Sequence, residues 1–82
     1  MLEAFYKHLD AESNFSPHTV RAYASDVKKF LAYVERSNIK LAQVDHKFIR
    51  QYLAFLGNFN LKKRTLSRKV SALRHFFTFL QK

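Results

Sequence analysis

Residues 16–36 read SPHTVRAYASDVKKFLAYVER, and this stretch decides the fold. Its first two residues predict a helix start, because a Ser side chain can accept a hydrogen bond from a free backbone amide and Pro at the first helical position loses no bond. From Pro17 to Arg36 the apolar residues recur every three or four positions, which predicts one long helix with a single buried stripe. The predicted stripe consists of Val20, Tyr23, Ala24, Val27, Phe30, Leu31 and Val34.

Three further segments show the same helical spacing. A first helix precedes residue 16 and ends between residues 10 and 14. A third follows the cap residue Asp45 and stops at Gly57-Asn58, and a last helix begins at Lys62 or Lys63 without an obvious N-cap residue. The positions that we expect to be buried in these helices are Leu2, Phe5, Tyr6, Leu9, Ile49, Tyr52, Leu53, Leu56, Leu66, Val70, Leu73, Phe77 and Leu80.

Composition favours helices joined by short links. A single Gly and a single Pro in 82 residues do not supply the turns that a strand-and-turn architecture needs every few positions. We therefore expect an all-α, compact four-helix bundle that forms one domain over residues 1–82. A domain of this size has room for one core but not for a catalytic cleft with a substrate lobe, so binding is expected rather than catalysis.

The charged residues are segregated along the chain. All six acidic residues lie before position 46, where six Lys and Arg balance them, whereas residues 46–82 carry nine Lys and Arg and no acid. The whole formal net charge of +9 thus belongs to the C-terminal half. Such a one-sided positive field on a small domain attracts polyanions, so nucleic acid is the first partner to consider.

The last helix concentrates its charge on the face opposite its apolar stripe. Arg and short polar side chains on a helix suit phosphate and base-edge contacts in the major groove of duplex DNA. A solvated face usually mixes both signs of charge, and here no acid is available. The residues predicted to contact DNA on and just before this helix are Lys62, Lys63, Arg64, Arg68, Lys69, Ser71, Arg74 and His75. A weaker cationic face along residues 17–36 holds Arg21, Ser25, Lys28, Lys29 and Arg36.

Other interpretations stay open at this point. Free amides next to Ser16, His18 and Thr19 could seat a phosphate, although ordinary capping is the simpler interpretation for Ser16. The cationic face could be merely solvated, could dock an acidic protein partner in a protein-interaction module, or could lie on a membrane surface. RNA is the other nucleic-acid candidate, but the aromatic residues follow core spacing, which disfavours single-strand recognition.

Nothing in the sequence indicates catalysis or a cofactor. There is no Gly-rich phosphate loop, no nucleophile motif and no carboxylate after Asp45, and the His residues lack the spacing of a metal site. The absence of Cys fits a reducing compartment. An acid at position 3 argues against a signal peptide, and no stretch approaches the roughly 20 apolar residues of a membrane span. We expect a cytoplasmic protein that acts without a metal, a cofactor or a membrane.

Two motifs resemble those of the N-terminal core-binding domain of Xer-type tyrosine recombinases and phage integrases. One is SPHTVRAY at residues 16–23 followed by Asp26, and the other is RTLSRKVSALRHFFTFL at residues 64–80. They occur in the order and at the spacing of that family, and the resemblance covers nearly the whole chain. It implies a four-helix, SAM-like domain that closes over one side of a recombination site while a separate C-terminal domain cleaves the strands.

The resemblance also implies site residues and partners. In that family the second and fourth helices lie against the major groove, and the catalytic residues, including the Tyr nucleophile, belong to the C-terminal domain. We therefore expect no enzymatic activity from this segment alone, although the parent would be a strand-exchange recombinase associated with the nucleoid. Its implied partners are double-stranded DNA, the catalytic domain of the same parent chain and neighbouring protomers. By motif position the DNA-facing residues are Thr19, Arg21, Ser25, Arg64, Thr65, Arg68, Lys69 and Arg74.

Two aromatic residues depart from the apolar stripe of the last helix. Phe79 falls on its polar side and Phe76 at the edge of the stripe, so we expect one or both to be exposed in an isolated domain. Either a partner surface such as the catalytic domain covers them, or the first helix packs there. The sequence does not separate these two possibilities.

Overall fold

The computed structural model describes residues 2–12 and 14–81. Within these ranges the chain forms helices and no strand, which confirms the all-α prediction. The elements in chain order are α1 (Leu2–Ala11), α2 (Pro17–Arg36), the 3₁₀ turn η1 (Leu41–Gln43), α3 (His46–Leu56), the 3₁₀ turn η2 (Gly57–Phe59) and α4 (Lys63–Leu80).

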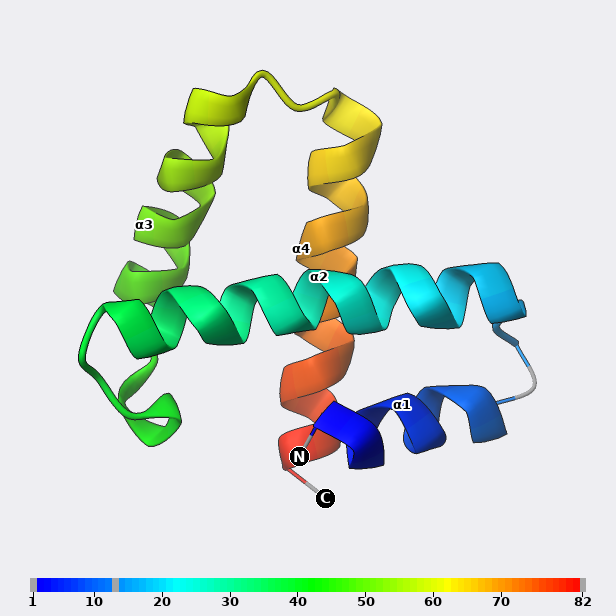
Figure 1. The fold of residues 1–82 in the computed structure, drawn as a ribbon. Helices are drawn as coiled ribbons and strands as arrows, with labels where there is room; N and C mark the ends of the chain where they lie inside the picture. Colours follow the sequence, from blue (N-terminus) through cyan, green and yellow to red (C-terminus); the bar gives the residue numbers. More distant parts are fainter. Residues whose placement is uncertain (1, 13, 82) are drawn as a thin grey trace.

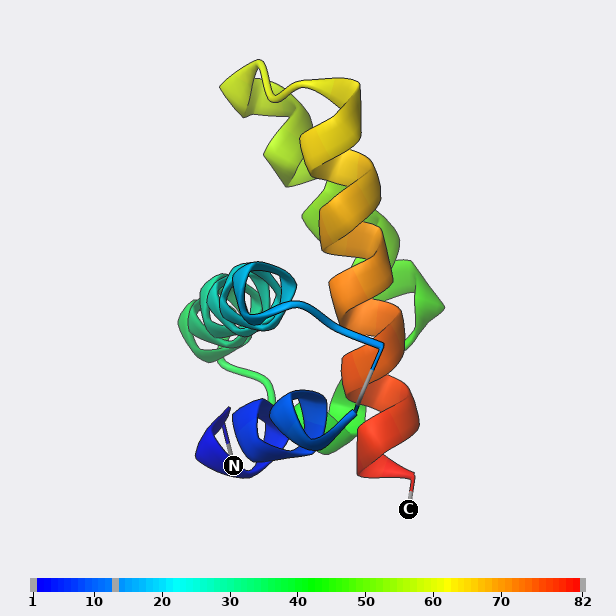
Figure 2. The same ribbon diagram turned by 90° about the vertical axis from the view of Figure 1, so that its right-hand side faces the viewer.

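Helix α2 is the centre of the arrangement. It crosses α4 at a steep angle and packs on both α4 and α1 (Figure 1). In the view along α2, α1 lies beside the last turns of α4 (Figure 2). Helices α3 and α4 extend together above the level of α2 in this view. The bundle is flat, with extents of 32 × 29 × 17 Å, so it offers two broad faces.

Two helix starts follow the capping signals in the sequence. The Ser16 hydroxyl accepts a hydrogen bond from the Thr19 amide at 3.2 Å, and Pro17 occupies the first turn of α2. The Asp45 carboxylate accepts one from the Phe48 amide at 2.9 Å. The Ser16 side chain thus caps α2, which was the simpler of the two interpretations of this residue. Helix α4 starts after Lys62 with no side-chain cap.

The end of α3 differs from the prediction in its detail. The helix stops at Leu56, but Gly57 keeps a right-handed helical conformation and begins η2. The chain reverses three residues later at Asn60, whose φ of 53° is left-handed. Asn tolerates that conformation because its short polar side chain can bond locally, so the turn needs no glycine there.

Two clusters of buried side chains make up the core. The first core cluster joins α1, the first half of α2 and the end of α4, and the second joins the end of α2 with α3 and the middle of α4. Tyr6, predicted to be buried, is 39% exposed. The first cluster comprises Phe5, Leu9, Val20, Val27, Ala72 and Phe76, and the second comprises Phe30, Val34, Tyr52, Leu56 and Leu73.

The buried side of α4 is rotated from the prediction. Val70 is 36% exposed, whereas Phe76 has no exposed surface. At about 100° per residue, the apolar stripe read from the sequence covers only the side that faces α3, but α1 and α2 pack on the adjacent side as well. The buried arc of α4 is therefore wider than its stripe and leaves Val70 beyond one edge.

Contact with α1 accounts for the two aromatic residues that depart from the stripe. The Phe5 ring lies 5.2 Å from Phe76 in an edge-to-face arrangement and 5.5 Å from Phe79, and the His8 ring lies 5.1 Å from Phe79. The first helix thus packs on both residues, which confirms the second of the two possibilities. No partner is needed to cover Phe76.

Candidate nucleic-acid interface

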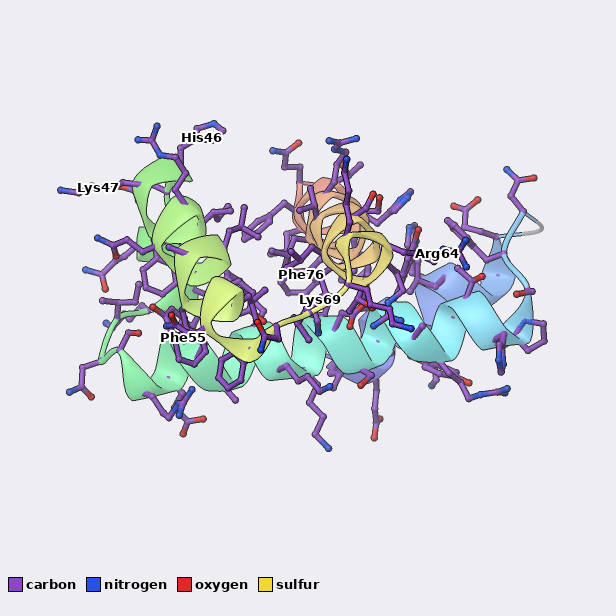
Figure 3. The ribbon with its side chains drawn as sticks, turned by 90° about the horizontal axis from the view of Figure 1, so that it is seen from above. His46, Lys47, Phe55, Arg64, Lys69 and Phe76 are labelled. Atoms are coloured by element: carbon purple, nitrogen blue, oxygen red, sulfur yellow. The ribbon has the colours of Figure 1, made fainter. Side chains whose placement is uncertain are left out.

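Most of the predicted contact residues are at the surface. On α2, Arg21, Ser25 and Lys28 are exposed and Thr19 is half-buried. Thr65 and Ser71 are half-buried on α4. Arg64 projects from the side of α4 that faces away from α3 (Figure 3). The exposed cations on and just before α4 are Lys62, Lys63, Arg64, Arg68 and Arg74.

A buried ionic cluster ties α2 to α4 where the two helices pack together. The Asp26 carboxylate accepts hydrogen bonds from Arg68 Nε at 2.8 Å, Arg68 Nη2 at 2.9 Å and Lys69 Nζ at 3.0 Å. We call Asp26, Arg68 and Lys69 the Asp26 triad. Its carboxylate is only 2% exposed, so two cations satisfy one buried anion, and the triad keeps one net positive charge.

Lys69 is not on the exposed flank where the sequence analysis put it. The side chain is 5% exposed and its ammonium group lies against Asp26 inside the bundle (Figure 3). The reason is the rotation of α4 described above, since Lys69 falls in the middle of the arc that α1, α2 and α3 cover. Lys69 therefore supports the helix crossing and is removed from the candidate DNA contacts.

Arg68 has an inner and an outer side. Its side chain is 42% exposed, although Asp26 holds two of its nitrogens. The hydrogen bond to Asp26 raises the pKa of the guanidinium, a group that is charged at every physiological pH in any case. A fixed cation that remains open to solvent is suited to contacting an anion.

His75 belongs to an aromatic cluster. Its ring stacks on Tyr23 of α2 at 5.4 Å and meets Phe15 edge-on at 5.2 Å. The ring is half-buried between elements, so its first role is packing. Tyr23 is half-buried in the same cluster, in line with the predicted core stripe.

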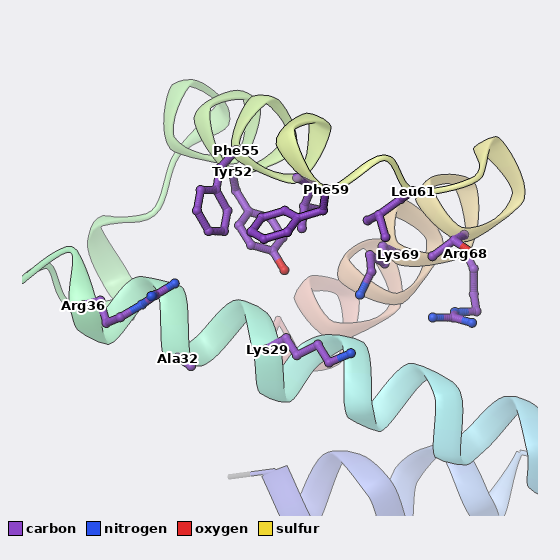
Figure 4. Close-up of a pocket in the computed structure, with 11 residues that line it drawn as sticks. Lys29, Ala32, Arg36, Tyr52, Phe55, Phe59, Leu61, Arg68 and Lys69 are labelled. Carbon is purple, nitrogen blue, oxygen red and sulfur yellow. The ribbon is translucent and has the colours of Figure 1, made fainter.

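A pocket of about 510 Å³ opens between α2, the end of α3 and the start of α4 (Figure 4). Lys29, Arg36 and Arg68 contribute cations to its lining, and Phe55 and Phe59 contribute aromatic rings. The Arg36 guanidinium lies 5.8 Å from the centre of the Phe55 ring. The pocket brings cations of α2 and α4 to one surface.

The Tyr52 hydroxyl points into this pocket (Figure 4). Burial raises its pKa, and the negative charge of Asp26 adds to the effect. Tyr52 was predicted to lie in the core, but the pocket was not predicted. An acid at the edge of one apolar stripe and a Lys at the edge of another were the signals that could have located the Asp26 triad.

The described part of the chain holds neither a metal-binding cluster nor a membrane-spanning helix. Among residues 2–12 and 14–81, no three His, Asp or Glu side chains gather in a way that could hold a metal ion. In the same part of the chain, no helix combines the length and the apolar character needed to cross a membrane.

Comparison with known proteins identifies the family. Residues 2–82 match the model of the phage integrase N-terminal SAM-like domain. Tyrosine recombinase XerC of Staphylococcus carnosus (strain TM300) is 42% identical over 77 residues, which cover 94% of this chain and 26% of the relative. XerC of Staphylococcus haemolyticus (strain JCSC1435) is 41% identical over 75 residues, or 92% of this chain and 25% of the relative.

XerC of Staphylococcus aureus (strain JH9) is 36% identical over 77 residues, with 94% of this chain and 26% of the relative covered. The chain thus spans about a quarter of the length of these relatives. None of the solved structures matches it significantly. The match over residues 2–82 and the XerC relatives confirm the resemblance seen in the two motifs: the chain belongs to the phage integrase N-terminal SAM-like domain family.

Proposed function

We propose that this domain binds duplex DNA through the exposed cations of α2 and α4, while a C-terminal domain of the same parent protein cleaves and rejoins the strands. Family membership supports the recombinase context, because the relatives are tyrosine recombinases. The observation that carries the choice of surface is the start of α4. There Lys62, Lys63, Arg64 and Arg68 are exposed, and no acid follows Asp45 in the sequence.

The dimensions of the domain suit one side of a duplex. Its longest extent is 32 Å, and one turn of B-DNA is roughly 34–36 Å long. A broad face of the bundle can therefore cover about one helical turn. With DNA carrying one negative charge per roughly 1.7 Å of axis, several phosphates lie within reach of the cations on that face.

The role that we propose is positioning. Phosphate contacts fix the register and orientation of a protein on DNA but carry no sequence information by themselves. The domain would hold the recombination site in the cytoplasm, next to the catalytic domain of its own chain and to neighbouring protomers on the same DNA. Binding by the 82-residue chain alone is then expected to be weak and only slightly selective.

An NMR titration tests the proposal most directly. The isotope-labelled chain is mixed with a short DNA duplex at moderate salt, and the shifted backbone amides are mapped. We expect shifts along residues 19–29 and 62–75. Shifts restricted to α1, or an absence of shifts, would contradict DNA binding through α2 and α4, and capture of an acidic protein that duplex DNA fails to displace would favour a protein-interaction module.

Replacing Arg64 by Ala is expected to weaken binding to duplexes of any sequence. If Arg64 neutralises one phosphate, the slope of log affinity against log salt concentration becomes shallower by about 0.9. The measurement is fluorescence anisotropy at several salt concentrations. Arg50→Ala is the matched control, because it removes the same charge from an exposed position on α3. Equal changes in slope for both variants would mean that net charge alone matters, and would exclude the α4 surface.

A further inference from the structure

The Asp26 triad leaves one edge of the Arg68 guanidinium open. Asp26 binds Nε and Nη2, at 2.8 and 2.9 Å, and so occupies the inner edge of the group. A guanidinium is planar and carries N–H donors on all three nitrogens. The donors on the Nη1–Nη2 edge therefore point away from Asp26, and this pair is the fork that binds two neighbouring acceptors at once.

Asp26 and Arg68 differ strongly in burial. The Asp26 side chain is 1% exposed, whereas that of Arg68 is 42% exposed. Arg68 lines the pocket between α2, the end of α3 and the start of α4, together with Lys29 (Figure 4). Thr65 belongs to the same lining. Arg68 is therefore the exposed member of the Asp26 triad, whereas Asp26 and Lys69 are buried.

We infer that Asp26 is a positioning residue for DNA recognition, which fixes Arg68 so that its Nη1–Nη2 edge is ready for a pair of acceptors on duplex DNA. The inference rests on the proposed function. Two acceptor pairs share the required chemistry: O6 and N7 of a guanine in the major groove, and two oxygens of one phosphate. A restrained side chain loses less rotational freedom on binding than a free one, so Asp26 raises affinity through Arg68.

The alternative is that Asp26 only holds α2 to α4. Lys69 contacts the same carboxylate from inside the bundle and is 5% exposed, so that contact can serve the helix crossing without Arg68. Simple electrostatics adds a second distinction. Removing an acid from a domain of net charge +9 should strengthen binding to DNA, whereas loss of a positioning residue should weaken it.

A double-mutant cycle separates these possibilities. Asp26→Asn alone would leave Lys69 buried beside an uncharged amide, so every variant also carries Lys69→Met, whose side chain keeps the apolar stem. The cycle compares Lys69→Met alone with the same protein carrying Asp26→Asn, Arg68→Lys or both. Arg68→Lys keeps a cation beside Asp26 but removes the planar fork. Each is titrated with a short duplex at several salt concentrations, and its thermal stability is measured alongside.

We expect Asp26→Asn to weaken DNA binding by about 3- to 10-fold when Arg68 is present, from the typical cost of immobilising a long side chain. In the Arg68→Lys background it should cost little, because an ammonium group has no planar fork to orient. The Nε–H signal of Arg68 in NMR spectra should lose its protection from solvent exchange in the Asp26→Asn variant. Glu35→Gln is the charge control, because it removes the same charge from an exposed position of α2 and should not weaken binding.

Two results would overturn the inference while the Lys69→Met protein still binds DNA. One is unchanged or tighter binding after Asp26→Asn with Arg68 present, and the other is an equal loss in both Arg68 backgrounds, which would indicate a purely structural role. Failure of the unmodified chain to bind any duplex would instead refute the proposed function.

A modified duplex identifies the acceptor. Replacing every guanine by 7-deazaguanine removes N7 and leaves the phosphates in place. If the contribution of Arg68 disappears, the fork binds guanine. If it persists, and Arg68→Gln in the protein that carries Asp26→Asn and Lys69→Met makes the salt slope shallower by about 0.9, the fork binds a phosphate. Either result supports a preformed fork, and a contribution of zero on both duplexes contradicts it.

Discussion

Replacing Asp26 by Ala is expected to reduce the free energy of unfolding by about 3–5 kcal/mol, the usual cost of breaking a buried ion pair from one side. Lys69 is 5% exposed and would be left buried without its carboxylate partner. The total stability of a domain of this size is about 4–12 kcal/mol, from roughly 0.05–0.15 kcal/mol per residue. We therefore expect a substantial unfolded population in mild denaturant, measured by circular dichroism during urea titration.

A second variant identifies the cause. Adding Lys69→Met to Asp26→Ala removes the uncompensated ammonium group and should recover at least about 1 kcal/mol, because apolar replacements of buried ion pairs are well tolerated. Glu35→Ala changes the same net charge at an exposed position of α2 and should alter stability by no more than about 0.5 kcal/mol. If Asp26→Ala were as mild as Glu35→Ala, the Asp26 triad would not stabilise the helix crossing.

Local signals made the helices predictable. Ser16 and Asp45 cap α2 and α3 through their own side chains, and Pro17 opens α2, so these starts depend on residues within one turn. The apolar stripe of α2 also includes all of its buried apolar residues, because α2 presents that stripe to both α1 and α4. Where the chain itself contains the cause of a structure, the sequence is sufficient.

Packing between helices made the rest unpredictable. The stripe read along α4 includes Val70 and omits Phe76, although Val70 is the exposed residue and Phe76 the buried one. A stripe shows where apolar residues lie on one helix, but not how many neighbours cover that helix. Helix α4 is covered on two adjacent sides, and that number is a property of the assembled bundle.

For the candidate interface, the exposed cations were predictable from the sequence, but the side chains that turn inward were not. Charge segregation pointed to the exposed cations of α4 such as Arg64, since an exposed residue needs no partner to specify it. It could not show that Lys69 turns inward, because its partner Asp26 lies 43 residues earlier in the chain. Likewise, nothing in the sequence around His75 indicated that its ring stacks on Tyr23, because that contact depends on the crossing of α2 and α4.

Phe76 is expected to be among the most sensitive positions in the core. Phe76→Ala should lower the free energy of unfolding by about 3–5 kcal/mol, because the lost ring leaves a cavity among well-packed neighbours. Phe76 has no exposed surface, and its ring centre lies 5.2 Å from that of Phe5 and 5.5 Å from that of Phe77. Thermal and urea unfolding followed by circular dichroism measures the effect.

Val70→Ala is the control for Phe76→Ala, since it also truncates an apolar residue of α4 but at a position that is 36% exposed. It should cost less than about 1 kcal/mol, because exposed positions lose little packing on truncation. The apolar stripe read from sequence alone predicts the opposite order, with Val70 central and Phe76 at the edge. A larger loss for Val70→Ala than for Phe76→Ala would therefore contradict the rotation of α4, and with it the burial of Lys69 against Asp26.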